Sequence, residues 1–70
     1  MNSNILLSKL RTAGIKSVDS GKIKTIEIRE YYGFPNSFSI FSIYIDGILR
    51  GQLDEHNTDK VVEEFINNFS

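Results

Sequence analysis

Apolar residues recur at helical spacing near the start of the chain. In residues 3–13, Leu6, Leu10 and Ala13 fall on one face of a helix, a spacing typical of an amphipathic helix packed on a core. Gly14 follows directly, and glycine is the residue that most readily adopts the left-handed conformation at a helix end. The pattern therefore predicts a helix over 3–13 that stops at Gly14.

The same kind of pattern returns at the end of the chain. Apolar residues there follow the spacing of a buried helical face: Val61, Val62, Phe65, Ile66 and Phe69. Asn57 or Thr58 can cap this helix, and Asp59 falls in its first turn, where the helix dipole favours negative charge. A second amphipathic helix is expected here.

Between these segments the pattern changes to that of strands. Residues 22–32 are rich in β-branched side chains, and Ile26 and Ile28 alternate with charged residues. Ile23 falls on the opposite parity, which predicts a β-bulge or twist near Lys24.

A hairpin is predicted around Asp46-Gly47, which separates the apolar run 37–45 from the next apolar residues. Asp-Gly tolerates the positive φ angles of a type I′ turn, so Ile45 should face Ile48 across the hairpin. The elements together predict one α+β domain over residues 1–70. Its order is helix, three antiparallel strands, helix (αβββα), with both helices on one face of the sheet.

Both faces of this hairpin are apolar, and the expected register assigns each residue to one of the two faces. We expect the helices to cover one face, because its small residues allow a close approach: Ile40, Ser42, Tyr44, Leu49, Gly51 and Leu53. The opposite face would then be exposed: Phe41, Ile43, Ile45 and Ile48, bordered by Arg50 and Gln52. Exposed apolar patches of this kind mark interfaces. A foreign partner, a homodimer seam and a reversed assignment of the two faces all remain open.

Two further segments are candidates for partner binding. Tyr32 and Phe34 lie in a loop with Gly33, and aromatic residues are enriched among binding hot spots, although we favour their folding back onto the core. Asp54 and Glu55 precede the acidic last helix and could meet a basic surface, with solvation as the favoured alternative.

Composition narrows the functional classes. The chain has no cysteine and one histidine, and its glycines form no phosphate-binding spacing, so neither a metal site, a cofactor nor catalysis is expected. No stretch approaches the ~20 apolar residues of a membrane span, and the first residues do not resemble a signal peptide. These features predict a cytoplasmic, non-enzymatic protein without membrane contact.

The element order resembles that of the double-stranded-RNA-binding domain, since Phe38 to Phe69 contains a hairpin, a glycine at Gly51 and a capped helix. The resemblance implies RNA binding through lysines at the start of the last helix. This chain has a single Lys60 there, beside Asp59, which would repel a phosphate backbone. Nucleic acid is therefore the alternative partner and not the first choice.

The layout and the two ends of the chain also resemble small phage-encoded anti-CRISPR proteins, which inhibit Cas nucleases. The resemblance lies in the opening amphipathic helix and in residues 57–69. Those inhibitors are strongly acidic DNA mimics, whereas this chain has a net charge of −1. The resemblance implies a phage or mobile-element inhibitor that acts by surface contact with a host defence enzyme. We therefore predict a protein-binding module, with a homodimer as a possible assembly.

Overall fold

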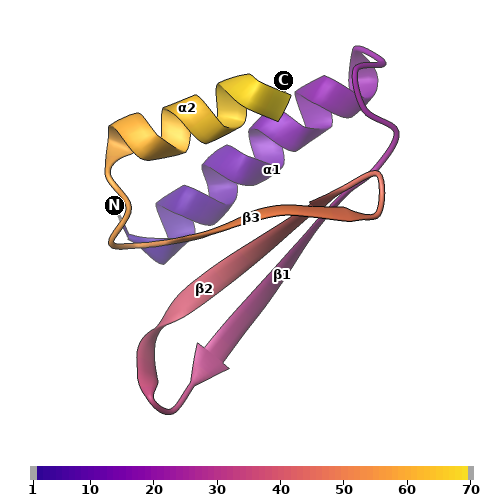
Figure 1. The fold of residues 1–70 in the computed structure, drawn as a ribbon. Coiled ribbons are helices and arrows are strands. Elements are labelled where there is room, and N and C mark those ends of the chain that lie inside the picture. The colour runs from indigo at the N-terminus through magenta and orange to yellow at the C-terminus, as the bar shows by residue number, and fades with distance from the viewer. Residues whose placement is uncertain (1, 70) are drawn as a thin grey trace.

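The computed structural model describes residues 2–69, and only the backbone of Asn36. The elements follow the predicted αβββα order (Figure 1): α1 (Ser3–Asp19), β1 (Ile26–Gly33), β2 (Asn36–Ile45), β3 (Ile48–Asp54) and α2 (Asp59–Phe69). The three strands form one antiparallel sheet in the order β1-β2-β3, and the two helices lie side by side over one of its faces. Within residues 2–69, neither helix has the length and apolar character needed to cross a bilayer.

Helix α1 extends past its predicted end. Gly14 lies inside the helix, and the helix continues to Asp19, with Ser20 as its C-cap and Gly21 following at a φ of 80°. The glycine at position 14 has another role, because a Cβ there would lie 2.7 Å from Cδ1 of Ile26. Gly14 thus brings α1 close to β1, and the prediction that the helix stops there was wrong.

Strand β1 is shorter than predicted and regular where a bulge was expected. It begins at Ile26, so Ile23 lies before the strand, where it packs against the core without disturbing the alternation. The irregularity in the β1–β2 pairing lies instead between Tyr31 and Gly33.

The Asp46-Gly47 turn forms as predicted. Asp46 and Gly47 have φ angles of 53° and 82°, and Ile45 pairs with Ile48. Oδ1 of Asp46 also accepts hydrogen bonds from the backbone N–H groups of Lys24 (2.7 Å) and Thr25 (3.0 Å). The turn therefore also anchors the segment that leads into β1.

The pairing between β2 and β3 contains a bulge that the sequence did not predict. Tyr44 pairs with Leu49, as expected, but Ile43 pairs with Gly51, so Arg50 is the extra residue. Beyond this point every β3 side chain changes face relative to the predicted register. Leu53 consequently lies opposite Phe41.

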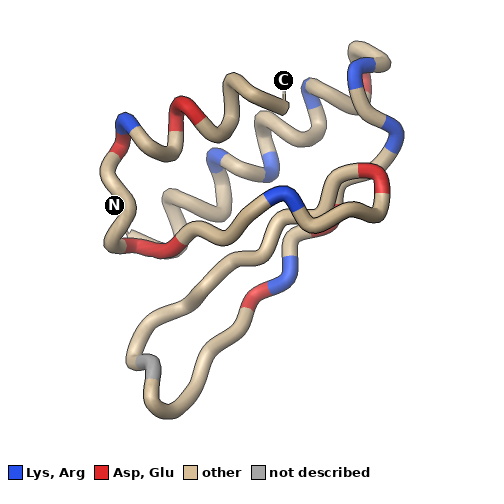
Figure 2. The backbone as a smooth tube through the Cα atoms, viewed as in Figure 1, with Lys and Arg blue, Asp and Glu red and all other residues tan. Residues whose placement is uncertain are grey.

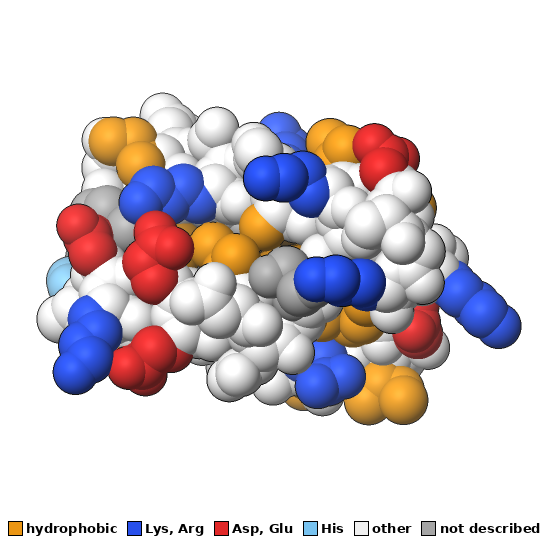
Figure 3. All heavy atoms as spheres, turned by 90° about the horizontal axis from the view of Figure 1, so that it is seen from above, with side chains coloured by type: hydrophobic (Ala, Val, Ile, Leu, Met, Phe, Trp, Pro, Cys, Tyr) orange, Lys and Arg blue, Asp and Glu red, His pale blue; other side chains and the backbone are white. Residues whose placement is uncertain are grey.

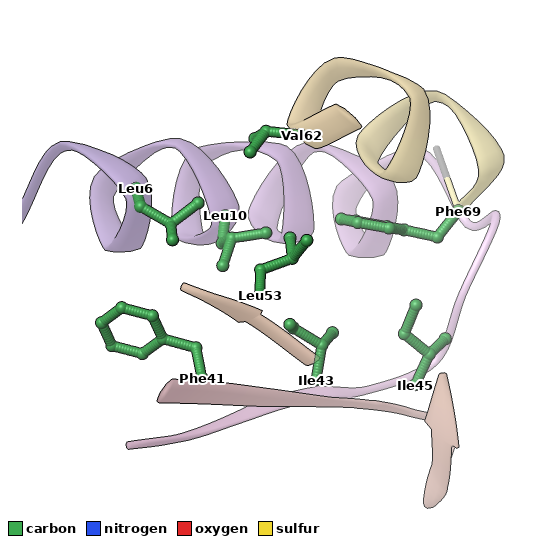
Figure 4. Close-up of a cluster of buried hydrophobic side chains, with 8 residues drawn as sticks. All are labelled: Leu6, Leu10, Phe41, Ile43, Ile45, Leu53, Val62 and Phe69. Atoms are coloured by element: carbon green, nitrogen blue, oxygen red, sulfur yellow. The ribbon is translucent and has the colours of Figure 1, made fainter. Parts of the chain in front are cut away.

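The core lies between the helices and the sheet (Figure 4). Its buried apolar side chains come from every element except β1: Leu6, Leu10, Phe41, Ile43, Ile45, Leu53, Val62 and Phe69. The prediction that Phe41 and Ile43 are exposed is wrong, since their exposed fractions are 1% and 0%. The physical reason is the register with β1, in which Ile28 faces Ile43 and places Ile43 on the face that the helices cover.

Candidate protein-binding surface

The most exposed aromatic residues lie at the end of the β1–β2 hairpin, which extends beyond the helices (Figure 1). The side chains of Tyr31, Tyr32 and Phe34 are 48%, 71% and 102% exposed, and we call these three residues the aromatic tip. The expectation that this loop folds back onto the core is therefore wrong. Ile40 pairs with Asp54, the last residue of β3, so the hairpin beyond it lies outside the three-stranded part of the sheet.

The aromatic tip has a defined shape. A shallow hollow of about 330 Å³ is lined by the tip together with Glu30 and Gly33. Behind it, the hydroxyl of Ser39 donates a hydrogen bond to Oε2 of Glu30, across the two strands of the hairpin. This contact joins β1 to β2 at the base of the tip.

The outer face of the sheet, opposite the helices, carries polar and apolar side chains together. Arg29 lies over the ring of Tyr44, 4.5 Å from its centroid, and its Nε is 3.1 Å from Oε2 of Glu27. The hydrogen bond to Glu27 is the main cause that raises the pKa of Arg29 above its usual value. Leu49 on this face is 50% exposed, although the sequence predicted that helices would cover it.

Ser42 is buried on this outer face and not beneath a helix. Its Oγ accepts a hydrogen bond of 2.9 Å from Nε2 of Gln52, the residue opposite it on β3. Gly51 does face the helices as predicted, because a Cβ there would lie 2.9 Å from Cε2 of Phe65.

The other predicted binding residues do not join the aromatic tip. Ile48 (64% exposed) and Arg50 lie near the Asp46-Gly47 turn, at the opposite end of β2. Asp54 is half-buried at the end of β3, where its Oδ1 accepts a hydrogen bond of 2.8 Å from the backbone N–H of His56. Glu55, also half-buried, follows it in the turn to α2. The predicted site is thus divided among the tip, the far turn and the β3–α2 connection.

Charged groups are interspersed over the helical face (Figure 3). Basic residues follow α1 and the loop after it (Figure 2): Lys9, Arg11, Lys16, Lys22 and Lys24. Nζ of Lys9 lies 3.3 Å from Oε1 of Glu63, so one of these charges is offset by α2. In the described part of the chain, no group of three or more acidic or histidine side chains could hold a metal ion.

The sequence pattern did not identify Tyr44 and Leu49 as surface residues, because it placed both on the face that the helices were expected to cover. A signal was present, because Glu27 and Arg29 mark the polar face of β1. Register places Glu27 opposite Tyr44, so that polar face continues onto the outer side of β2. The polar face of β1 predicts the outer face of β2 only when the pairing between the two strands is known. The irregular loop between β1 and β2 hides this pairing in the sequence.

Comparison with models of protein families, with curated proteins and with solved structures finds no match to this chain.

Proposed function

We propose that this protein is a non-enzymatic binding module that contacts a protein partner through the aromatic tip. The observation that carries the proposal is the exposure of Phe34, 102%, on a hairpin that projects from the body of the domain. Full burial of a phenylalanine side chain is more favourable than its exposure to water by roughly 1.5–3 kcal/mol, and the exposed Phe34 does not make this contribution. An interface that covers the tip would recover this contribution.

The shape and chemistry of the tip favour insertion into a concave surface. Tyr32 and Phe34 present large apolar area with few rotatable bonds, so ordering them on binding loses little entropy. The hydroxyl of Tyr32 adds a donor and acceptor at the rim. A projecting aromatic hairpin therefore suits a pocket or cleft on the partner.

The inhibitor form of this proposal comes from the resemblance to small phage-encoded anti-CRISPR proteins. In that form the protein acts in the cytoplasm, and its tip occupies a cleft of a host defence nuclease. DNA cleavage by a panel of Cas nucleases, measured with and without the protein, tests this form. We expect inhibition that the substitution Phe34→Ser relieves; cleavage unaffected by the protein in every case would contradict the inhibitor form.

An affinity capture with matched variants tests the wider proposal. The tagged protein is compared with Phe34→Ser and with the control Val61→Ser, which removes a 42% exposed apolar side chain from α2. We expect a stoichiometric protein that the wild type and the Val61 variant retain and the Phe34 variant loses. Equal recovery by all three proteins would contradict a role for the tip.

Double-stranded RNA is the second candidate partner, and the row of basic residues on α1 and the loop after it is the observation that favours it. Against it, Asp59 flanks Lys60 at the start of α2, and Glu63 pairs with Lys9. This alternative predicts a salt-sensitive gel shift of duplex RNA and a captured partner that nuclease treatment removes.

A further inference from the structure

Strand β1 presents an open edge. It forms one side of the sheet, with β2 as its neighbour. The carbonyl of Thr25 accepts a hydrogen bond of 3.0 Å from the N–H of Asp46, which directs the main-chain groups of Thr25 toward β2. Because these directions alternate along an antiparallel strand, the main-chain groups of Ile26, Ile28 and Glu30 point away from the sheet. Such an edge can pair with another strand.

An apolar groove runs beside this edge. It has a volume of about 210 Å³ and is lined by Arg11 and Ile15 from α1 and by Ile26 and Ile28 from β1. Ile15 is 60% exposed, so apolar surface continues from the strand edge onto the helix. The strand edge and the groove together form a surface that a partner strand can cover.

We propose that β1 pairs with β1 of a second copy of this chain, antiparallel and about a twofold axis at Ile28. Each Ile28 then faces Ile28 of the second copy, and the two exchange main-chain hydrogen bonds. Glu27 faces Arg29 of the second copy, and the same contact recurs on the other side of the axis. The two three-stranded sheets become one continuous sheet, with the helices of both copies on the same face.

Among the axes from Glu27 to Glu30, the charges of β1 select this register. An axis at Glu27 or at Arg29 would place each of these residues opposite its own copy, so like charges would face each other. An axis at Glu30 would place the Glu30 carboxylates of the two copies opposite each other. An axis at Ile28 instead sets opposite charges across both pairs. The self-complementary charge order of this strand argues for a second copy as the occupant of the edge.

The groove adds a second charge match in the same register. Glu30 of the second copy faces Ile26, and Ile26 shares the groove with Arg11. The carboxylate therefore approaches the guanidinium, while the surrounding isoleucines lose water contact. The homodimer surface comprises Arg11, Ile15, Ile26, Glu27, Ile28, Arg29 and Glu30.

A charge exchange tests the register. Glu27→Arg and Arg29→Glu each place like charges across the proposed axis, so each variant should dimerise about tenfold more weakly than the wild type. Mixed in equal amounts, the two variants should form a heterodimer, because position 27 of each copy would again face a charge of opposite sign at position 29 of the other. Sedimentation velocity over a concentration series measures the wild type, each variant and the mixture against the 8.0 kDa monomer.

Lys16→Glu is the control variant. It makes the same change of charge as Arg29→Glu, but it lies on the exposed side of α1, so this variant should dimerise like the wild type. Circular dichroism verifies that each variant is folded. A wild-type protein that remains at 8.0 kDa up to its solubility limit would overturn the proposal. A dimer that neither charge variant weakens, or variants that fail to associate on mixing, would overturn it as well.

Discussion

Gly51 of β3 lies directly beneath the ring of Phe65 of α2, where a Cβ would be 2.9 Å from Cε2 of Phe65. The missing side chain lets α2 pack close to the sheet. The same ring contacts Phe69 edge to face, with centroids 5.4 Å apart. Phe65 therefore has little freedom to move away from a larger residue at position 51.

We accordingly expect Gly51→Ala to destabilise the protein by about 1–3 kcal/mol, because the added methyl displaces a packed ring. Urea denaturation measures the change. The double variant Gly51→Ala/Phe65→Leu should show a coupling energy of about 0.5 kcal/mol or more between the two positions. Strict additivity would mean that Phe65 does not limit the space at Gly51.

Ile43 lies at the centre of the core and is 0% exposed. Ile43→Ala should reduce the free energy of unfolding by about 2–5 kcal/mol, and Ile43→Lys should abolish folding, since an unpaired charge would be buried. Circular dichroism and thermal denaturation check both outcomes. A folded Ile43→Lys protein would show that this side of β2 faces solvent.

These core positions show what the sequence could and could not predict. Helical spacing around Leu6 and Leu10 and the Asp46-Gly47 turn depend on local chemistry, and the structure confirms both. The exposed face of the hairpin depended on the bulge at Arg50 and on pairing with β1, which are set by tertiary contacts. The bulge moves Gly51 from the Ser42 face of the hairpin to the Ile43 face, and a shift of one residue exchanges the faces of a strand in this way. Because the small residue Gly51 had been used to identify the face that the helices cover, Phe41 and Ile43 were misassigned as exposed.

The aromatic tip could be located from sequence but its exposure could not. Tyr32 and Phe34 stand out as aromatic residues beside a glycine, yet the same composition also suits a loop that closes a small core. The decisive factor is that β1 and β2 extend past Asp54, where β3 ends. Relative strand length is a property of the folded sheet.

Asp46 links stability to pH. Hydrogen bonds from the backbone N–H groups of Thr25 and Lys24 lower the pKa of its carboxyl below the ordinary 3.8. Because the folded value lies below the unfolded one, the ionised carboxylate stabilises the fold above pH 3.8, and this contribution is lost as the pH falls through the folded value.

Asp46→Asn isolates this effect, because asparagine tolerates the same positive φ. We expect the variant to be less stable than the wild type at neutral pH, with the difference shrinking as the pH falls below 3.8. Urea denaturation of both proteins over a pH series measures it. A stability difference that is independent of pH would contradict the linkage.

Ser17 lies on the buried side of α1, where its residue is 1% exposed and its Oγ has no hydrogen-bond partner among the described residues. Ser17→Ala should raise the free energy of unfolding by about 1–3 kcal/mol, since it removes an unsatisfied buried hydroxyl. The control Ser8→Ala, at an exposed position of the same helix, reports the gain from helix propensity alone. Equal gains for both variants would indicate that the Ser17 hydroxyl is satisfied.

Site-specific photo-crosslinking at the aromatic tip tests the central claim most directly. A benzophenone amino acid replaces Phe34 in one sample and the control residue Val61 in another, and both are irradiated in cells of the native host. Since both positions are exposed, neither replacement should unfold the protein. We predict one discrete protein adduct from position 34 that is absent from position 61 and unaffected by nuclease. No adduct at position 34, or the same adducts from both positions, would contradict protein binding through the tip.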